Sequence, residues 1–182
     1  MLIRTNFPAR KRPSLSVRPD FIATSVAGID FGFLRSKGIK ACFIDLDGTV
    51  VSRGTHDVEA SIQKALKDSG LSVYIATNRP KSRTLKSLKE DLSASGVIHP
   101  SGLFPKPSKH YYQTALRAHN FKAYEVIMIG DRYIQDIFGA NRAGLYSMVV
   151  HKNGGSAGRF DTVLSKTEAH LTKRFTGRYR EL

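Results

Sequence analysis

The apolar residues of this chain fall into short continuous runs separated by stretches with helical spacing. Runs of strand length occupy residues 41–44, 71–76, 126–129 and 145–150, and a shorter run lies at 97–98. Between them, apolar side chains recur every three or four residues around 58–66, 85–92, 112–116 and 134–138, as on one face of a helix. The runs are too continuous for strands with one exposed face. The alternation therefore predicts a three-layer α/β/α fold in which a parallel sheet lies between helices.

Both ends of the chain differ from this central part. Residues 1–20 contain three prolines and five basic residues, which predicts an irregular basic lead-in. In residues 20–34 the apolar positions recur at helical spacing, which predicts an amphipathic helix leading into the domain; they are Ile22, Val26, Ile29 and Phe33. The last part of the chain is basic and interrupted by glycines. We therefore divide the chain into a basic N-terminal segment with its leading helix (1–37), a core (38–151) and a basic C-terminal extension (152–182).

Length and composition point to one globular domain in a reducing compartment. With 182 residues, 41% hydrophobic and 24% charged, the chain has the profile of an ordinary folded protein. No apolar run approaches the ~18 residues of a membrane span, and the N-terminus lacks the apolar stretch of a secretory signal. Cys42 is the only cysteine, and its apolar surroundings predict a buried, inert thiol. We expect a cytoplasmic protein.

The charge balance narrows the kind of partner. There are 29 basic and 15 acidic residues, and the resulting net charge of +14 favours polyanionic partners. The excess of basic over acidic residues is densest before residue 41 and after residue 150.

Polar residues follow the apolar runs, where parallel α/β proteins bind their ligands. The first run leads into Asp45 and Asp47, and the second leads into three polar residues, Thr77, Asn78 and Arg79. The run at 126–129 is followed by Asp131, Arg132 and Asp136, and Lys106 lies between two prolines in the loop before residue 112. Side chains two residues apart in an extended chain share one side, so Asp45 and Asp47 can face one site. Joined by Asp131 and Asp136, they would form an all-oxygen cluster, which Mg²⁺ prefers over zinc or copper.

In this order, the motifs resemble those of the haloacid dehalogenase-like (HAD) phosphohydrolases, whose first motif is Asp-x-Asp-Gly-Thr. The resemblance covers about residues 38–151. It implies an Mg²⁺-dependent phosphatase with the catalytic residues Asp45, Asp47, Thr77 and Lys106. Asp45 would form an aspartyl-phosphate, Asp47 would serve as acid and then base, and Thr77 and Lys106 would bind the phosphoryl group. The metal would be held by Asp45, Asp131, Asp136 and the Asp47 carbonyl.

Each sequence segment between the motifs is long enough for only one helix and short connections, so we expect no cap domain. The stretch 130–144 resembles the capless IIIA group, which includes the phosphatidylglycerophosphate phosphatases. Gln135 departs from that group's usual threonine. By this resemblance the substrate is phosphatidylglycerophosphate at an anionic membrane surface. Asn78, Arg79 and Arg132 follow motif residues, and we expect them to bind the substrate together with Thr77 and Lys106. An interfacial helix near the C-terminus would present an apolar face made of Leu164, Leu171, Phe175 and Leu182.

Three other hypotheses remain open at this point. The basic charge also suits a phosphatase acting on nucleic-acid ends, although no aromatic platform is interleaved with the basic residues. A soluble sugar-phosphate phosphatase is another enzyme of the same type. From a different class, the chain could be a non-catalytic RNA- or ribosome-binding module on a HAD fold, a reading that the intact motif set disfavours.

Overall fold

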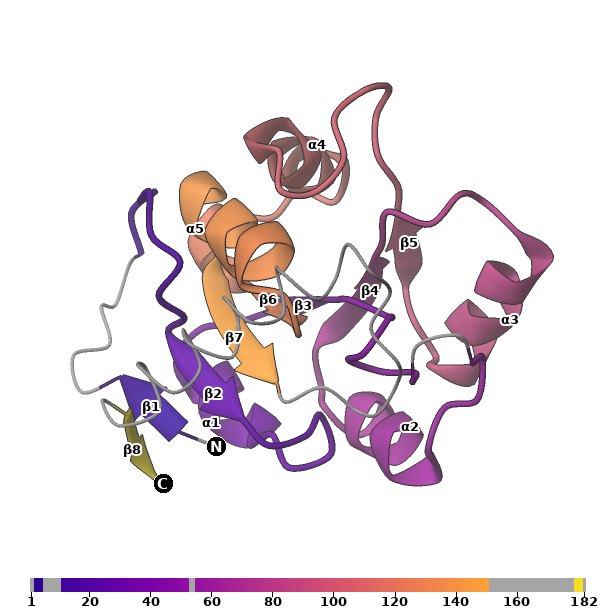
Figure 1. Ribbon diagram of the computed structural model, residues 1–182. Coiled ribbons are helices and arrows are strands. Elements are labelled where there is room, and N and C mark those ends of the chain that lie inside the picture. Colours follow the sequence, from indigo (N-terminus) through magenta and orange to yellow (C-terminus); the bar gives the residue numbers. More distant parts are fainter. Residues whose placement is uncertain (1, 5–10, 53–54, 151–178, 182) are drawn as a thin grey trace, which may run out of the picture.

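One sheet of eight strands organises the computed structural model, which describes residues 2–4, 11–52, 55–150 and 179–181 (Figure 1). The strands are β1 (Leu2–Arg4), β2 (Phe21–Ala23), β3 (Ala41–Ile44), β4 (Ser72–Ala76), β5 (Gly96–Ile98), β6 (Val126–Gly130), β7 (Tyr146–Val150) and β8 (Tyr179–Glu181). Their order across the sheet is β5-β4-β3-β6-β7-β2-β1-β8. All pairs from β5 to β2 are parallel, and β1 pairs antiparallel with β2 and β8. The predicted parallel α/β fold is confirmed.

Helices cover both faces of this sheet (Figure 1). They are α1 (Phe31–Ser36), α2 (Ala60–Lys67), α3 (Arg83–Asp91), α4 (Lys109–Ala118), the 3-10 helix η1 (Ala123–Glu125), the π-helix η2 (Tyr133–Phe138) and α5 (Gly139–Ala143). Alternation along β3 shows how the layers form: Cys42 and Ile44 pack with α1, α2 and α3, whereas Ala41 and Phe43 pack with α4 and α5. Every residue of β3, β6 and β7 is buried, as their continuous apolar runs predict.

The leading helix predicted over residues 20–34 is wrong for most of its length. Residues 21–23 form β2, which pairs in parallel with β7, and the helix there is the short α1, beginning at Phe31. The spacing of Ile22, Val26 and Ile29 looked helical because a short strand and the turn after it also bury residues at those positions. The segment before residue 38 therefore contributes a strand to the sheet.

The irregular basic lead-in is anchored to the sheet by a buried ion pair. Lys11 pairs with Asp20, and both side chains are almost fully buried. The Asp20 carboxylate accepts hydrogen bonds from the backbone N and the Oγ of Ser147, at 2.9 and 3.1 Å. The Asn141 amide donates to the carbonyl oxygens of Ser16 and Arg18, at 2.6 and 3.0 Å. Residues 11–20 are irregular as predicted, and this network fixes them in place. The predicted irregular lead-in is wrong at residues 2–4, which form the strand β1 because they pair with β2 and β8.

A cap domain is absent from the described residues at the two positions where one would be inserted. Those between β3 and β4 form α2 and irregular connections, and those between β4 and β5 form α3 and short turns. No helix within the described ranges has the length and apolar character needed to span a membrane. The interfacial helix expected near the C-terminus, like the 152–182 extension except for β8, lies outside the described residues.

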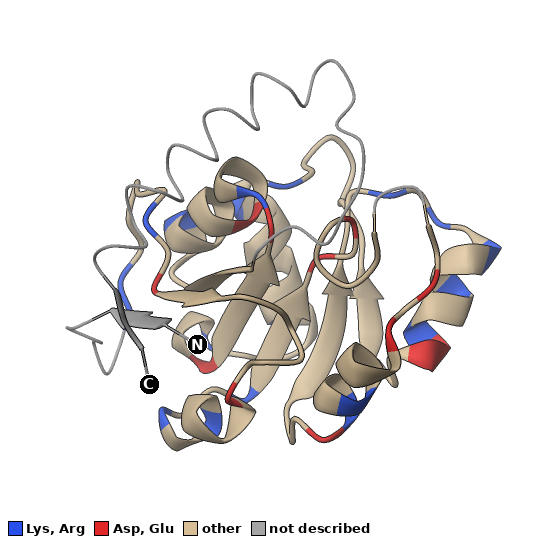
Figure 2. Ribbon diagram, turned by 60° about the horizontal axis from the view of Figure 1, so that its bottom comes forward, with Lys and Arg blue, Asp and Glu red and all other residues tan. Residues whose placement is uncertain are grey.

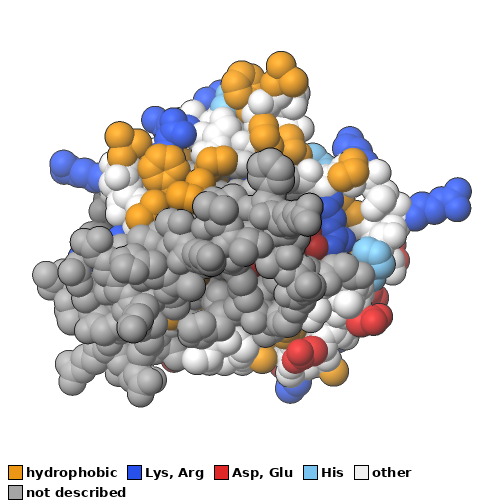
Figure 3. Space-filling model, viewed as in Figure 1, with side chains coloured by type: hydrophobic (Ala, Val, Ile, Leu, Met, Phe, Trp, Pro, Cys, Tyr) orange, Lys and Arg blue, Asp and Glu red, His pale blue; other side chains and the backbone are white. Residues whose placement is uncertain are grey.

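The charged side chains of the described residues are distributed over the surface. Lys and Arg are spread over several helices and connecting loops, with Asp and Glu among them (Figure 2). Most large apolar side chains are buried, and on the face seen in Figure 3 hydrophobic side chains show at the surface over the part that contains α4 and α5. Among the described residues, the exposed large apolar side chains are Leu15, Leu103, Phe104 and Ile134.

Candidate active site

The two aspartates of the first motif lie where β3 ends and the chain turns. Asp45 follows the last residue of β3 directly and is buried. The strand does not persist to Asp47, because a tight turn begins at Leu46; Gly48 has a φ of +85° there, and its N–H donates to the Val51 carbonyl at 2.8 Å. Asp45 and Asp47 nevertheless line the same pocket. The expected convergence thus comes from the turn and not from an extended strand.

Strand register brings the other motifs beside Asp45. Ile44 lies opposite Ile75 of β4 and Ile129 of β6, so the chain leaves all three strands at the same edge of the sheet. Thr77 follows β4 and is buried, and its Oγ1 accepts a 3.0 Å hydrogen bond from the N–H of Arg79. Asp131 follows β6 and is also buried.

Asp136 reaches this edge because Gly130 leaves room for it. The side chain of Asp136 comes from η2, and its Oδ2 accepts a 3.2 Å hydrogen bond from the N–H of Arg132. A Cβ atom placed on Gly130 would lie only 2.3 Å from Oδ2 of Asp136. No side chain at position 130 is compatible with the observed position of Asp136.

Lys106 connects the carboxylates within the buried part of the site. Its Nζ donates to Oδ1 of Asp45 at 2.6 Å, to Oδ1 of Asp136 at 2.7 Å and to the carbonyl of Ala76 at 2.9 Å. All three donors of the ammonium group are therefore used. Lys106 is buried, so this arrangement places one positive charge directly between two negative ones.

Burial and charge act in opposite directions on these groups. Burial raises the pKa of Asp45 to about 6, although the nearby Lys106 ammonium partly offsets this rise. Burial alone would lower the pKa of Lys106, but the carboxylates of Asp136 and Asp45 outweigh it and raise that pKa. Lys106 therefore stays charged.

Burial also raises the pKa of Cys42 to about 12, so its thiol is buried and inert, as predicted.

Asn78 has a role in this structure that the sequence did not reveal. Its side-chain Nδ2 donates to the Lys106 carbonyl at 3.2 Å, and its Oδ1 accepts from the Lys106 N–H at 2.9 Å. This reciprocal pair fixes the backbone of Lys106 against the end of β4. We predicted Asn78 to bind substrate; it lines the pocket, and its amide group holds the loop that carries Lys106.

The mouth of the pocket contains a second ion pair. The Arg79 guanidinium donates from Nε to Oδ2 of Asp47 at 2.8 Å and from Nη2 to Oδ1 of the same carboxylate. Hydrogen bonding to Asp47 raises the pKa of Arg79. Both side chains are partly exposed, unlike the buried Lys106 cluster. Arg79 is thus placed at the pocket, as predicted, with Asp47 as its partner.

The residues that line the pocket were all expected from the motifs except Gln135, whereas Lys106, which was also expected to bind substrate, is buried and does not line it. A cavity of about 380 Å³ is lined by Asp45, Asp47, Thr77, Asn78, Arg79, Arg132 and Gln135. We did not predict a binding role for Gln135, although its position directly before Asp136 was a signal that could have indicated one.

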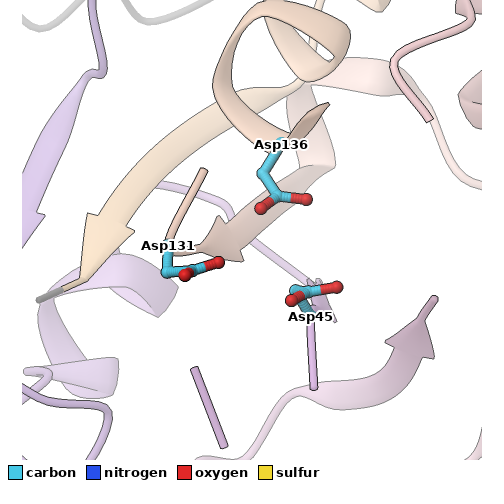
Figure 4. Close-up of side chains that lie close together, drawn as sticks. All are labelled: Asp45, Asp131 and Asp136. Carbon is cyan, nitrogen blue, oxygen red and sulfur yellow. The ribbon is translucent and has the colours of Figure 1, made fainter. Parts of the chain in front are cut away.

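Three of the aspartates are arranged so that they could bind a single cation together. Asp45, Asp131 and Asp136 come from the ends of β3 and β6 and from η2, and their side chains are grouped around one space (Figure 4). Each offers a carboxylate oxygen, and these oxygens lie within 4.8 Å of one another. The donor set is entirely oxygen, which fits Mg²⁺. Asp47, whose carboxylate we expected in this cluster and whose backbone carbonyl the resemblance implied as a ligand, contributes no carboxylate to the group of three.

Comparisons with known proteins agree with this picture. A family model described as HAD-hydrolase-like matches residues 103–174. YqeG, a probable phosphatase of Bacillus subtilis strain 168, is 24% identical to this chain over 135 residues, which cover 72% of this chain and 76% of YqeG.

Solved structures support the fold. D,D-heptose 1,7-bisphosphate phosphatase from B. bronchiseptica, solved in complex with magnesium and phosphate, aligns with a TM-score of 0.52 at 16% identity, over 75% of this chain and 99% of that one. A haloacid dehalogenase-like hydrolase from Streptococcus pneumoniae aligns with a TM-score of 0.51 at 16% identity, over 74% and 99%. The chain is thus similar to HAD-like hydrolases where the family model matches, similar to a probable phosphatase over most of its length, and shares its fold with these solved structures.

Proposed function

We propose that this chain hydrolyses phosphate monoesters with the help of Mg²⁺, through a phosphoryl group carried on Asp45. The observation that carries the proposal is the buried cluster in which Lys106 contacts Asp45 and Asp136 while the oxygens of Asp45, Asp131 and Asp136 face one space. The three carboxylates would hold the cation, together with the backbone carbonyl of Asp47. When bound, Mg²⁺ supplies positive charge that offsets the repulsion between a phosphate dianion and a carboxylate.

The first step forms a covalent intermediate. A carboxylate oxygen of Asp45 attacks phosphorus, and the bond from phosphorus to the leaving oxygen breaks. The leaving oxygen keeps that electron pair and takes a proton from Asp47. Lys106 would hold the nucleophile in place through its bond to Oδ1, and Thr77, which lines the pocket, would bind the phosphoryl oxygens.

The second step returns the enzyme to its initial state. Asp47 takes a proton from a water molecule whose oxygen attacks phosphorus, and the bond from phosphorus to Asp45 breaks. Inorganic phosphate leaves, and Asp45 is again a carboxylate. Because Asp47 is held by Arg79 at the pocket mouth, Arg79 lies within reach of whatever group surrounds the leaving oxygen.

For the substrate we propose phosphatidylglycerophosphate, presented at the cytoplasmic face of a membrane. A pocket whose mouth is formed by partly exposed side chains suits a phosphate that remains attached to a large assembly. Arg79 and Arg132 line it and would bind the second, diester phosphate of such a lipid. The net charge of +14 suits an anionic surface.

The test is phosphate release from three substrates: phosphatidylglycerophosphate in anionic vesicles, a 3′-phosphorylated oligonucleotide and a soluble sugar phosphate. Asp45→Asn is the control for the nucleophile, and chelation of Mg²⁺ is the control for the cation. Selective turnover of the lipid that both controls abolish is the expected result. Turnover of the oligonucleotide or sugar phosphate alone would refute the lipid assignment, and no turnover of any substrate would favour the non-catalytic binding module.

A further inference from the structure

A short turn before Lys106 presents two apolar side chains to solvent. The N–H of Phe104 donates to the Ser101 carbonyl at 3.3 Å, and Gly102 takes a φ of +60°, so residues 101–104 form a closed turn. At its tip Leu103 is 94% exposed and the neighbouring Phe104 is 51% exposed. Phe104 also packs against His110, with 4.8 Å between the ring centroids and 52° between the ring planes. Single exposed leucines are ordinary, but an ordered turn that points two adjacent large apolar side chains outward is not.

This turn is mechanically tied to the active site. Leu103 precedes Lys106 by three residues, so their Cα atoms are separated by at most about 11 Å. The backbone of Lys106 is held by its two hydrogen bonds with the Asn78 side chain, which fixes the base of the loop. On η2, the partly exposed Ile134 directly precedes the pocket residue Gln135. Apolar side chains thus project from two segments that also carry residues of the site.

The charged residues in the stretch of chain that contains the turn favour an anionic partner. From Leu92 to Tyr124 the chain contains no aspartate or glutamate. Within that stretch Lys109, Arg117 and Lys122 are exposed. A stretch of chain with an apolar tip, exposed cations and no acids has the composition of a segment that enters the headgroup region of an anionic membrane.

We propose that residues 101–105 are a membrane-docking turn, in which Leu103 and Phe104 insert between the headgroups of an anionic lipid surface. Docking in this way would bring the pocket mouth to the plane in which a lipid phosphate monoester lies. The proposal rests on the proposed function for its biological purpose, but docking itself requires no catalysis. A convex tip of two side chains suits a lipid surface, which deforms around it, better than a protein partner, which would need a matching pocket.

The absence of tryptophan from the chain allows a direct measurement of insertion. In the full-length variant Leu103→Trp, fluorescence excited selectively at tryptophan comes from position 103 alone. The matched control is Leu15→Trp, which replaces another strongly exposed leucine, at 83%, on the segment before β2. We expect vesicles of phosphatidylcholine and phosphatidylglycerol to shift the emission of Leu103→Trp to shorter wavelength and to leave that of Leu15→Trp unchanged. An unchanged spectrum for Leu103→Trp, or equal shifts in both variants, would overturn the proposal.

A binding measurement complements the spectra. The double variant Leu103→Ser/Phe104→Ser should partition onto the same vesicles at least ten-fold more weakly than the native chain, with unchanged hydrolysis of a soluble aryl phosphate. Binding within two-fold of the native chain would overturn docking through this turn. Loss of soluble activity would show misfolding, and the Leu103→Trp result then decides. Vesicle binding without turnover of phosphatidylglycerophosphate would reject the proposed substrate and retain the docking turn.

Discussion

Replacing Asp45 with asparagine should stabilise the metal-free protein at neutral pH. Burial raises the pKa of Asp45 from 3.8 to about 6, so an ionised Asp45 costs folding free energy that a neutral side chain does not. At 1.36 kcal/mol per pKa unit, this difference corresponds to about 3 kcal/mol. Asparagine has nearly the same shape and cannot ionise. For a chain of this size, 3 kcal/mol corresponds to a rise in Tm of about 6–12 °C.

The sign of this effect gives it a characteristic pH dependence. Below pH 4 Asp45 is protonated in both the folded and the unfolded chain, and the native protein keeps the full stability that a neutral Asp45 allows. Between about pH 4 and pH 6 the unfolded chain loses this proton first, so native stability falls as the pH rises. Above about pH 6 the native chain has lost the whole 3 kcal/mol, at roughly 1.36 kcal/mol per pKa unit. The stability gap between Asp45→Asn and the native chain should therefore be near zero at pH 4 and reach its maximum above pH 6.

The assay is thermal and urea unfolding of both proteins in EDTA from pH 4 to pH 8. Asp68→Asn is a suitable control, because the hydrogen bond from Lys64 lowers the pKa of this exposed aspartate and the effect of its substitution should have the opposite sign. Adding Mg²⁺ should narrow the gap by stabilising the ionised native site. A gap that does not change with pH, or a native chain more stable than Asp45→Asn at pH 8, would refute the electrostatic reasoning.

Three further substitutions test other parts of the structure. Gly130→Ala should displace Asp136, whose Oδ2 would lie 2.3 Å from the new Cβ; we expect about 1–3 kcal/mol of destabilisation and weaker Mg²⁺ binding by calorimetry. Asn78→Ala removes two hydrogen bonds to the backbone of Lys106, so we expect about 1–3 kcal/mol lower stability in urea and a reduced kcat, with native kcat counting against a positioning role. Lys11→Ala leaves a buried carboxylate without its cation and should cost about 3–5 kcal/mol, whereas a loss under 1 kcal/mol would show that the pair is dispensable.

The sequence predicted the central sheet well because the physical signal is local. Continuous apolar runs mark strands buried on both faces, and the predicted runs match β3, β4, β6 and β7 to within one residue. The N-terminal helix failed for the opposite reason. Residues 21–23 form a strand only because β7 offers a parallel partner more than 120 positions later in the chain, and helical spacing cannot reveal such pairing.

The same distinction explains what could be anticipated at the site. Acids and a lysine at strand ends could be recognised as a motif, and strand register brings their side chains together. The two hydrogen bonds between Asn78 and Lys106 join residues 28 positions apart, and the ion pair of Arg79 with Asp47 joins residues 32 apart. Both depend on how the loops meet after folding. Side-chain partners of this kind can be identified only in the folded structure.

The buried network around Lys11 also constrains how this protein can change over generations. Lys11, Asp20, Asn141 and Ser147 satisfy one another's hydrogen bonds inside the fold, so replacing any one of them leaves a polar group without its partner. Asn141 is moreover part of α5, which directly follows the π-helix that carries Asp136. These four positions should therefore vary together among descendants of this sequence, and drift in the basic lead-in should be accompanied by compensating replacements next to the last motif.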